Sequence, residues 1–191
     1  MGNVFYFDWE FDFLYWLQSI HNPVLDGFMT FITKFGDAGI FWIVLSVLML
    51  IICKDKRVGW TSGLALVFSL LIINFALKNV VARARPFWID DSVKLLVKAP
   101  TEYSFPSGHS SASFAASVSI VQYAKYRKQG IAAVILAVLV AFSRMYLFVH
   151  FPTDVIAGVL LGIVEALLAG IIIRAIFKKR QNKLNCVEES K

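Results

Sequence analysis

The sequence is short of charge. Only 17% of its 191 residues are Asp, Glu, Lys or Arg, whereas soluble domains carry about 25%. Hydrophobic residues make up 58% of the chain and the mean hydropathy is +0.68. This composition excludes an ordinary soluble domain and predicts an integral membrane protein, with one domain over residues 1–180.

Cysteine is scarce as well. Cys53 and Cys186 lie far apart and lack the spacing of a metal site, so both are interpreted as free thiols. The N-terminus lacks the basic start of a signal peptide, and none is expected. The formal net charge is +6, but the basic residues lie in short clusters at the ends of apolar segments. That arrangement disfavours nucleic acid as a partner and is typical of a protein in the bilayer.

Long apolar segments predict the architecture, because a crossing helix needs about 20 mostly apolar residues. The candidate windows are 39–53, 58–77, 108–124, 130–149 and 154–177. They predict an all-α, polytopic membrane helix bundle of about five to six transmembrane helices. Basic clusters follow the first, third and fifth windows, which puts all three on one face, the cytoplasmic one by the positive-inside rule. Their members are Lys54, Lys56, Arg57, Lys125, Arg127, Lys128, Arg174, Lys178, Lys179, Arg180 and Lys183.

The two ends of the chain differ from this pattern. Residues 1–37 hold five acidic residues against one lysine, with many aromatic residues and with breaks at His21–Pro23 and Gly36–Gly39. They predict one or two amphipathic helices in the outer interface, with an additional, imperfect span as the alternative. Residues 178–191 predict a disordered end, of which 181–191 form a short cytoplasmic tail.

The stretch KNVVARARP, residues 78–86, carries the first candidate site residues. Lys78 and Arg85 are seven positions apart, nearly two helical turns, so they are expected on one side of a helix that ends at Pro86. Two cations near a helix end suit a phosphate. The alternative is that both reach to lipid headgroups. Arg83 is expected to face another direction and to contact headgroups.

The stretch FPSGHSSAS, residues 105–113, begins the third apolar window. Ser107 is a candidate N-cap, and Gly108 lets a ligand approach the backbone closely. The free N–H groups of a helix N-terminus bind anions. His109, in the first turn, is placed to donate a proton to a ligand there. The alternative is an ordinary serine cap followed by small residues for tight helix packing.

The stretch SRMYLFVHFPTD, residues 143–154, carries the most information. Arg144 lies in an apolar span, where a buried cation needs a partner. Pro152 predicts a helix start, with His150 at its mouth and Asp154 one turn in. That spacing lets the carboxylate accept from one imidazole nitrogen and leaves the other free as a nucleophile. The alternative is a His–Asp contact that only holds a loop.

The predicted topology brings all three stretches to the outer face, because loops 87–106 and 148–153 both lie there. The set contains two histidines, one aspartate and three cations. Zinc is the obvious competitor, but three nearby cations would repel a metal and attract an oxyanion. We therefore expect a phosphate ligand and neither metal nor cofactor.

The motifs K-x6-RP, PSGH and SR-x5-H-x3-D run in this order from Lys78 to Asp154. Together they resemble the three-part signature of the type 2 phosphatidic acid phosphatase (PAP2) family, membrane lipid phosphatases related to vanadate haloperoxidases. The resemblance implies that His150 attacks phosphorus to form a phosphohistidine, that Asp154 orients it and that His109 protonates the leaving lipid oxygen. It also implies that five residues hold the phosphoryl oxygens without a metal: Lys78, Arg85, Ser107, Gly108 and Arg144.

The implied activity is hydrolysis of a membrane lipid phosphate at the extracytoplasmic face. Candidate substrates are undecaprenyl pyrophosphate, phosphatidylglycerophosphate and phosphatidate. The alternatives are a lipid phosphotransferase that uses the same site and a non-catalytic protein that binds lipid phosphates. Among the other polar residues, Glu165 is expected in a helix–helix hydrogen bond and Glu102 in a solvated loop. Gly158 and Gly162 predict a packing face.

Overall fold

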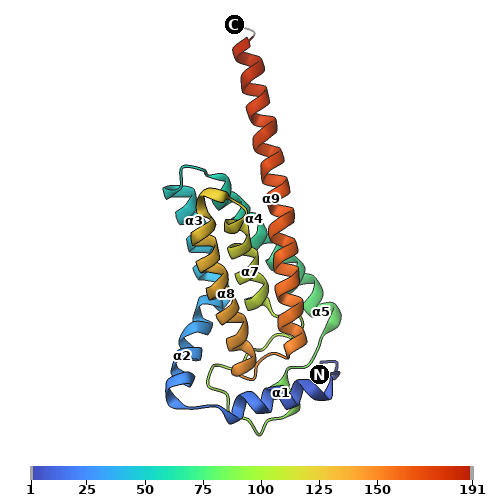
Figure 1. The fold of residues 1–191 in the computed structure, drawn as a ribbon. Coiled ribbons are helices and arrows are strands. Elements are labelled where there is room, and N and C mark those ends of the chain that lie inside the picture. The colour runs from blue at the N-terminus through green and yellow to red at the C-terminus, as the bar shows by residue number, and fades with distance from the viewer. Residues whose placement is uncertain (1, 190–191) are drawn as a thin grey trace.

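The computed structural model describes residues 2–189, with backbone alone at positions 184 and 186–189. Within that range the elements are all helices, apart from an isolated bridge between Asn3 and Arg83. In chain order they are α1 (Asp8–Ser19), α2 (Pro23–Thr33), η1 (Lys34–Gly39), α3 (Ile40–Ile52), α4 (Arg57–Ser69), η2 (Leu70–Leu77), α5 (Lys78–Val81), α6 (Pro86–Ile89), α7 (Gly108–Val121), η3 (Ala124–Tyr126), α8 (Arg127–Tyr146) and α9 (Pro152–Glu189) (Figure 1). The predicted all-α fold is confirmed.

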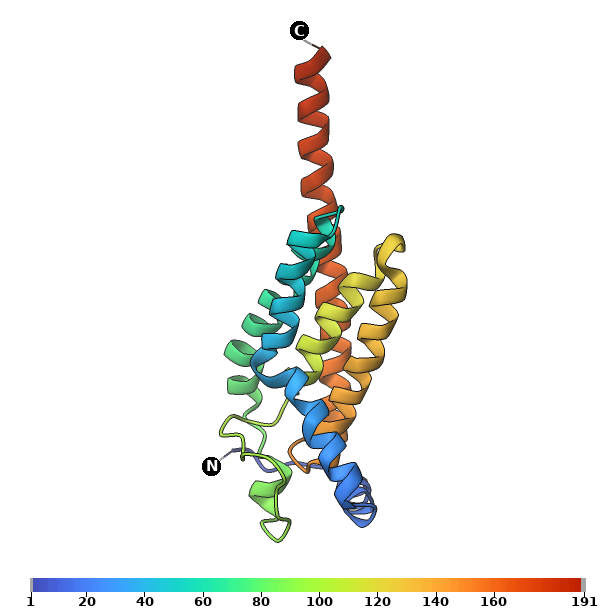
Figure 2. The same ribbon diagram turned by 90° about the vertical axis from the view of Figure 1, so that its left-hand side faces the viewer.

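The bundle is built around α7, which lies against α4, α8 and α9 (Figures 1 and 2). Among residues 2–189, four segments are long and apolar enough to cross a membrane: Pro23–Ile52, Arg57–Val81, Ala124–Tyr146 and Pro152–Lys183. The exposed apolar side chains of these segments are mostly isoleucine, leucine and valine, with some phenylalanine and one tryptophan, as expected where the surrounding solvent is hydrocarbon. The chain is therefore a multi-pass membrane protein.

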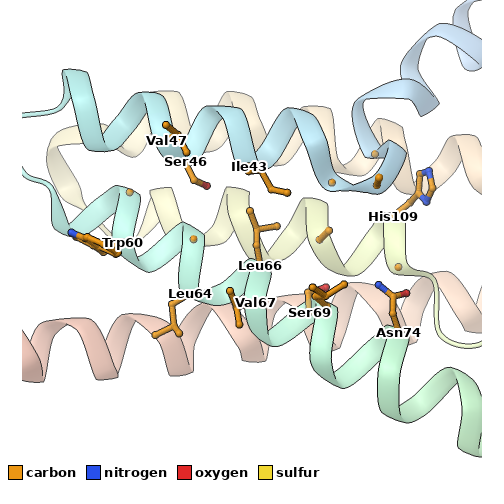
Figure 3. Close-up of a pocket in the computed structure, with 18 of the residues that line it drawn as sticks. Ile43, Ser46, Val47, Trp60, Leu64, Leu66, Val67, Ser69, Asn74 and His109 are labelled. Atoms are coloured by element: carbon orange, nitrogen blue, oxygen red, sulfur yellow. The ribbon is translucent and has the colours of Figure 1, made fainter.

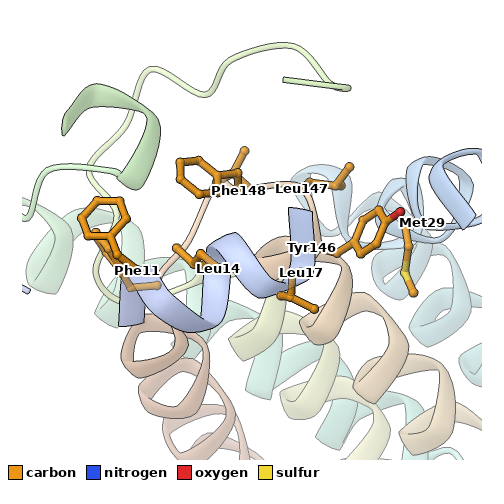
Figure 4. Packing of buried hydrophobic residues seen from close by; sticks show 9 residues of the cluster. Phe11, Leu14, Leu17, Met29, Tyr146, Leu147 and Phe148 are labelled. Atoms are coloured by element: carbon orange, nitrogen blue, oxygen red, sulfur yellow. The ribbon is translucent and has the colours of Figure 1, made fainter. Parts of the chain in front are cut away.

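Residues 1–37 divide into two parts with different positions. Helix α1 lies across the end of the bundle, where Phe11, Leu14 and Leu17 pack against the chain that follows α8 (Figure 4). Helix α2 instead continues through η1 into α3, with a bend at Ala38 and Gly39, both in the left-handed region (Figure 2). This differs from an interfacial position for all of 1–37, and it is not an additional span either, because residues 23–37 belong to the same candidate span, Pro23–Ile52, as the predicted window 39–53.

The C-terminal end also differs from the sequence prediction. Helix α9 continues to Glu189, so residues 178–189 are helical where a disordered end was expected. The reason is local, because no glycine or proline follows Gly170 and the basic segment is rich in strong helix formers. Residues 190 and 191 of the predicted tail lie outside the described residues.

Helix α9 packs tightly on α7 through Gly158 and Gly162, as predicted. A Cβ at Gly158 would come within 2.5 Å of the Ser107 carbonyl oxygen, and one at Gly162 within 2.4 Å of the Ser111 carbonyl oxygen. The predicted interhelical hydrogen bond is also present, because Ser111 Oγ donates to Glu165 Oε2 at 2.9 Å. This packing fixes the start of α7 beside the start of α9.

Candidate active site

The three motifs meet at the end of the bundle where α1 lies, opposite the C-terminal end of α9 (Figure 1). They surround a cavity of about 560 Å³. Its lining includes six of the predicted site residues: Lys78, Arg85, Gly108, His109, Arg144 and His150. Ser107 and Asp154 lie behind this lining, where both are fully buried.

His150 is held on one ring nitrogen and open to the cations on the other. Its Nδ1 is 3.5 Å from Asp154 Oδ2, and its Nε2 is 3.2 Å from Arg85 Nη1. Burial lowers the pKa of His150 well below its ordinary value, and the positive charge of Arg85 acts in the same direction. The imidazole is therefore neutral at neutral pH, which is the form a nucleophile needs.

Ser104 also holds this pair, although the sequence analysis missed it. Its Oγ donates to Asp154 Oδ2 at 2.5 Å and lies 3.4 Å from His150 Nδ1. The backbone N–H of Phe151 donates to the same carboxylate oxygen at 2.9 Å. A serine in the outer loop carries no spacing signal, so only the folded chain identifies it.

Lys78 and Arg85 reach the cavity from different segments, not from one helix as predicted. Helix α5 ends at Val81, and Ala82 takes a left-handed conformation with φ of 49°. The backbone of Asn3 pairs with residues 82 and 84, which draws the chain away from the helix axis. Pro86 then begins α6 instead of ending a helix, as proline does at a first helical position.

Arg85 and Arg144 are buried cations with few anionic partners. Arg85 donates to the carbonyl oxygens of Glu102 at 2.6 Å and Val149 at 2.7 Å, and burial lowers its pKa to about 10. It remains charged at neutral pH. Arg144 donates from Nη1 to Thr33 Oγ1 at 2.5 Å, whereas its buried Nε has no partner. Both side chains therefore keep donor capacity for an anion.

Glu102 lies in the outer loop with 64% of its side chain exposed, as predicted, but it also has a cationic partner that was not expected. Its carboxylate accepts a hydrogen bond from Lys78, and it lines the cavity. That hydrogen bond holds the pKa of the Glu102 carboxyl below its usual range, with the charges of Lys78 and Arg85 acting in the same direction. A carboxylate thus binds the very cation that was assigned to phosphate.

The start of α7 has the predicted cap. Ser107 Oγ accepts from the backbone N–H of Ser110 at 3.4 Å. A Cβ at Gly108 would lie 3.8 Å from Lys78 Nζ, so the first peptide of the helix lies beside a cation. An anion between them would meet both the helix N-terminus and the ammonium group.

His109 has a carboxylate partner that its own motif does not supply. Its Nε2 is 3.0 Å from Oδ1 of Asp37, which lies in η1. In the sequence Asp37 is one of the five acidic residues of 1–37, without a motif of its own. The two residues are far apart in sequence, and no periodicity links them.

Arg83 does not contact lipid headgroups, and that prediction is wrong. Its side chain is buried, with Nη1 donating to Asp154 Oδ1 at 2.6 Å and Nη2 donating to Glu10 Oε2 at 2.7 Å. The prediction extended the helix past Val81. Because the helix ends there, helical periodicity no longer determines the direction of the Arg83 side chain.

A second, apolar cavity of about 1040 Å³ lies between α3, α4 and η2 (Figure 3). Ile43, Val47, Leu66 and Val67 line it, and His109 stands at its end. Both cavities are lined in part by the same four residues: Lys78, Glu102, Gly108 and His109. A ligand with a polar head and an apolar chain could therefore occupy both, with His109 at the junction.

Comparison with known proteins identifies relatives of this arrangement. Residues 59–180 match the family model of the PAP2 superfamily. An undecaprenyl-diphosphatase of Sulfolobus acidocaldarius is 37% identical over 72% of this chain and 66% of its own length. The undecaprenyl-diphosphatase BcrC of Bacillus subtilis is 30% identical over 78% of this chain and 76% of its own length.

Two solved structures have the same fold. Aquifex aeolicus LpxE superposes with a TM-score of 0.72 at 25% identity, over 85% of this chain and 95% of its own. A PAP2 type phosphatidylglycerolphosphate phosphatase from Bacillus subtilis gives a TM-score of 0.69 at 30% identity, over 89% of this chain and 85% of its own.

Proposed function

This chain belongs to the PAP2 superfamily and is a membrane-bound phosphatase, and we propose that it removes phosphate from a membrane lipid through a phosphohistidine on His150. One observation carries the proposal. His150 presents a neutral Nε2 to buried cations while Asp154 and Ser104 hold its Nδ1. A contact that merely held a loop would not require cations with spare donors around the ring.

In the first step, Nε2 of His150 attacks phosphorus, the N–P bond forms and the bond to the lipid oxygen breaks. The proton on Nδ1 stays in place and is shared with Asp154, which stabilises the positive charge that develops on the ring. Arg85, Arg144, Lys78 and the start of α7 bind the phosphoryl oxygens, where negative charge builds up.

His109 takes up a proton from solvent when the phosphate anion of the substrate binds beside Lys78 and Arg144, and it then supplies this proton to the leaving lipid oxygen. In the second step the now neutral His109 accepts a proton from water, and the resulting hydroxide oxygen attacks the phosphohistidine. Inorganic phosphate leaves, and both histidines return to their starting forms. One water is consumed and one lipid alcohol or lipid monophosphate is released, so the cycle balances without a redox partner.

The substrate is proposed to be a lipid because the apolar cavity reaches the acid, His109. The leaving oxygen connects phosphorus to the lipid chain, so the acid belongs at the junction of the two cavities. Undecaprenyl pyrophosphate, phosphatidylglycerophosphate and phosphatidate all have this layout. Relatives with 30% or more identity are named for the first two classes, as undecaprenyl-diphosphatases and a phosphatidylglycerophosphatase.

The decisive assay measures phosphate release from a panel of these three lipids by the detergent-solubilised protein, with chelator present. We expect release by the wild type and none by His150→Ala. Vanadate, which takes up the trigonal-bipyramidal geometry of phosphoryl transfer, is expected to inhibit. Labelled acceptor lipid in place of inorganic phosphate would identify a phosphotransferase. Activity that chelation abolishes and zinc restores would contradict the cationic site.

The site is proposed to face the extracytoplasmic side, because the basic clusters lie at the opposite end of the bundle and the positive-inside rule assigns that end to the cytoplasm. In intact cells an impermeant thiol reagent should label a cysteine placed at the exposed Ser92. It should not label Cys53 or Cys186. Labelling of Cys53 from outside, with Ser92→Cys protected, would reverse the orientation.

A further inference from the structure

Arg83 makes four hydrogen bonds beside the proposed site, and the reaction as described does not use it. Its Nη1 donates to Asp154 Oδ1 at 2.6 Å and to Thr153 Oγ1 at 2.7 Å. Its Nη2 donates to Glu10 Oε2 at 2.7 Å, and its Nε donates to the Phe5 carbonyl oxygen at 3.0 Å. The side chain is only 2% exposed. Every guanidinium nitrogen is therefore engaged in one fixed arrangement.

The contacts of Asp154 are divided between its two carboxylate oxygens. Oδ1 accepts from Arg83, whereas Oδ2 accepts from Ser104 and Phe151 and lies 3.5 Å from His150 Nδ1. Because a guanidinium presents its donors in a rigid plane, Arg83 fixes the rotation of the carboxylate. It also supplies the positive charge without which a buried carboxylate is costly.

Glu10 fixes Arg83 in turn. This residue of α1 is fully buried, and its Oε1 accepts from the Thr153 hydroxyl at 2.6 Å and the Thr153 backbone N–H at 3.2 Å. Glu10 thus holds both the guanidinium and the first turn of α9, from which Asp154 projects. The aromatic ring of Phe151 lies 4.2 Å from the Arg83 guanidinium carbon and closes one side of the network.

The N-terminal helix is well anchored for such a role. Phe11, Leu14 and Leu17 are buried against the segment that carries His150 (Figure 4). Asn3 pairs with the backbone on both sides of Arg83. Glu10 and Asn3 both lie outside residues 59–180, the part of the chain that matches the family model.

We propose that Arg83 and Glu10 are positioning residues for the reaction: Arg83 orients Asp154 towards His150, and Glu10 holds Arg83, so that α1 completes the support of the nucleophile. This inference rests on the proposed function, because it takes His150 as the group that attacks phosphorus. Neither side chain lines the cavity, so neither is expected to touch the substrate.

The test compares Glu10→Gln, Arg83→Met, Arg83→Lys and the double variant Glu10→Gln/Arg83→Met in the full-length protein. We expect Arg83→Met to lower kcat by about 10–100-fold, which is the usual effect of removing a residue that orients a functional side chain without touching the substrate. Glu10→Gln should lower kcat less. In both, KM and the Kd of vanadate should stay within about threefold of wild type, because the phosphate ligands are untouched.

Three further measurements separate positioning from a purely structural role. The rate of phosphohistidine formation should fall with kcat, and Arg83→Lys should recover part of it. The double variant should lose no more activity than Arg83→Met, because Glu10 acts through Arg83. The control is Glu165→Gln, a buried and isosteric change in α9, which should leave kcat and phosphohistidine formation unchanged.

Wild-type kcat in folded Arg83→Met or Glu10→Gln would overturn the inference, as would a loss of vanadate affinity equal to the loss of kcat. If Arg83→Met does not fold, wild-type kcat in Arg83→Lys together with wild-type kcat in Glu10→Gln overturns it in the same way. Failure of the proposed function has a different signature, namely a wild type that releases no phosphate or a fully active His150→Ala. An active wild type and an inactive His150→Ala keep the two questions separate.

Discussion

The two histidines of the site occupy contrasting surroundings. The His150 side chain is 2% exposed and has neighbours on both ring nitrogens, whereas the His109 side chain is 22% exposed and stands where the two cavities meet. A nucleophile gains from a ring held in one orientation and one tautomer. A general acid must reach the leaving oxygen and later a water, which a position at the junction permits.

Their carboxylate partners differ in the same way. Asp154 is completely buried and receives hydrogen bonds from Arg83, Ser104 and the backbone of Phe151. The Asp37 side chain is 59% exposed and belongs to the bent segment η1. One carboxylate is rigidly built into the protein, and the other is close to solvent. Substitutions should therefore have larger effects around His150 than around His109.

The largest expected effect comes from His150→Ala. Turnover and any covalent phosphoenzyme should both disappear, with a loss on the order of 10⁴–10⁶-fold, as for other hydrolases that lose their nucleophile. The experiment traps acid-labile phosphohistidine during turnover and maps it. Phosphate found on His109 instead would make His109 the nucleophile and would contradict the roles assigned to the two histidines.

Asp154→Asn should rank second. The amide keeps the shape of the side chain but no longer favours a proton on Nδ1 of His150, so the attacking nitrogen is often protonated. A loss of about 10³–10⁴-fold in kcat is expected by analogy with other histidines that lose an orienting aspartate. Steady-state kinetics check it, with vanadate affinity as the control for an intact phosphate site. A loss below about tenfold would show that the carboxylate only holds the loop.

His109→Ala should have a smaller effect that depends on the leaving group. Removal of a positioned acid costs about 10²–10⁴-fold, and the lower part of this range is expected for a diphosphate, whose leaving group needs less help. The kcat for a phosphomonoester, whose leaving group is an alkoxide, should fall more. The measurement is the ratio of kcat values for the two substrate types in variant and wild type. An identical loss on both would remove His109 from the leaving-group step.

Asp37→Asn should cost less again, about tenfold or below, because an exposed hydrogen bond contributes little to orientation. The amide oxygen can still accept from the ring, so the geometry is kept while the charge is lost. Rates with a phosphomonoester check this prediction, and Asp55→Asn, on the opposite end of the bundle, serves as the control. A loss of kcat as large as that of Asp154→Asn would show that the His109–Asp37 pair matters as much as the His150–Asp154 pair.

Local relations in this site were predictable from the sequence and remote ones were not. The cap at Ser107, the helix start at Pro152 and the His150–Asp154 contact all follow from spacings of a few residues. The partners Glu10 and Asp37 come from segments brought together only by tertiary packing. They are two of the five acidic residues of 1–37, and nothing in the sequence marks Glu10 as buried or Asp37 as the partner of His109.

The prediction that Arg83 contacts lipid headgroups was wrong for a different reason. The direction of this side chain was inferred from helical periodicity, but the helix stops at Val81 because backbone pairing with Asn3 competes with it. A contact with the far N-terminus thus overrode local propensity. Although the helix ends between them, Lys78 and Arg85 still line one cavity. The prediction that these two cations lie close together is therefore confirmed, but the single helix from which it was inferred is not present.

The smallest expected effect concerns the protonation state and tautomer of His150, which can be measured by spectroscopy. Burial and the charge of Arg85 lower the pKa of His150 below its ordinary value of 6.5. An ordinary histidine is half protonated at pH 6.5, whereas His150, with its pKa lowered, should remain neutral there and charge only at lower pH. Its proton should be on Nδ1, because that nitrogen lies 3.5 Å from Asp154 Oδ2 and 3.4 Å from Ser104 Oγ, whose own proton is donated to Asp154.

The chain has three histidines, so ¹⁵N NMR of histidine-labelled protein in detergent can resolve and assign each ring by single His→Gln variants. At pH 6.5 the Nε2 of His150 should show the shift of an unprotonated nitrogen and the Nδ1 that of a protonated one. Asp154→Asn should weaken this tautomer preference, while Asp37→Asn should leave it unchanged. A cationic His150 ring at pH 6.5 would mean that the nucleophile is not preformed and that the two histidines differ less than their surroundings indicate.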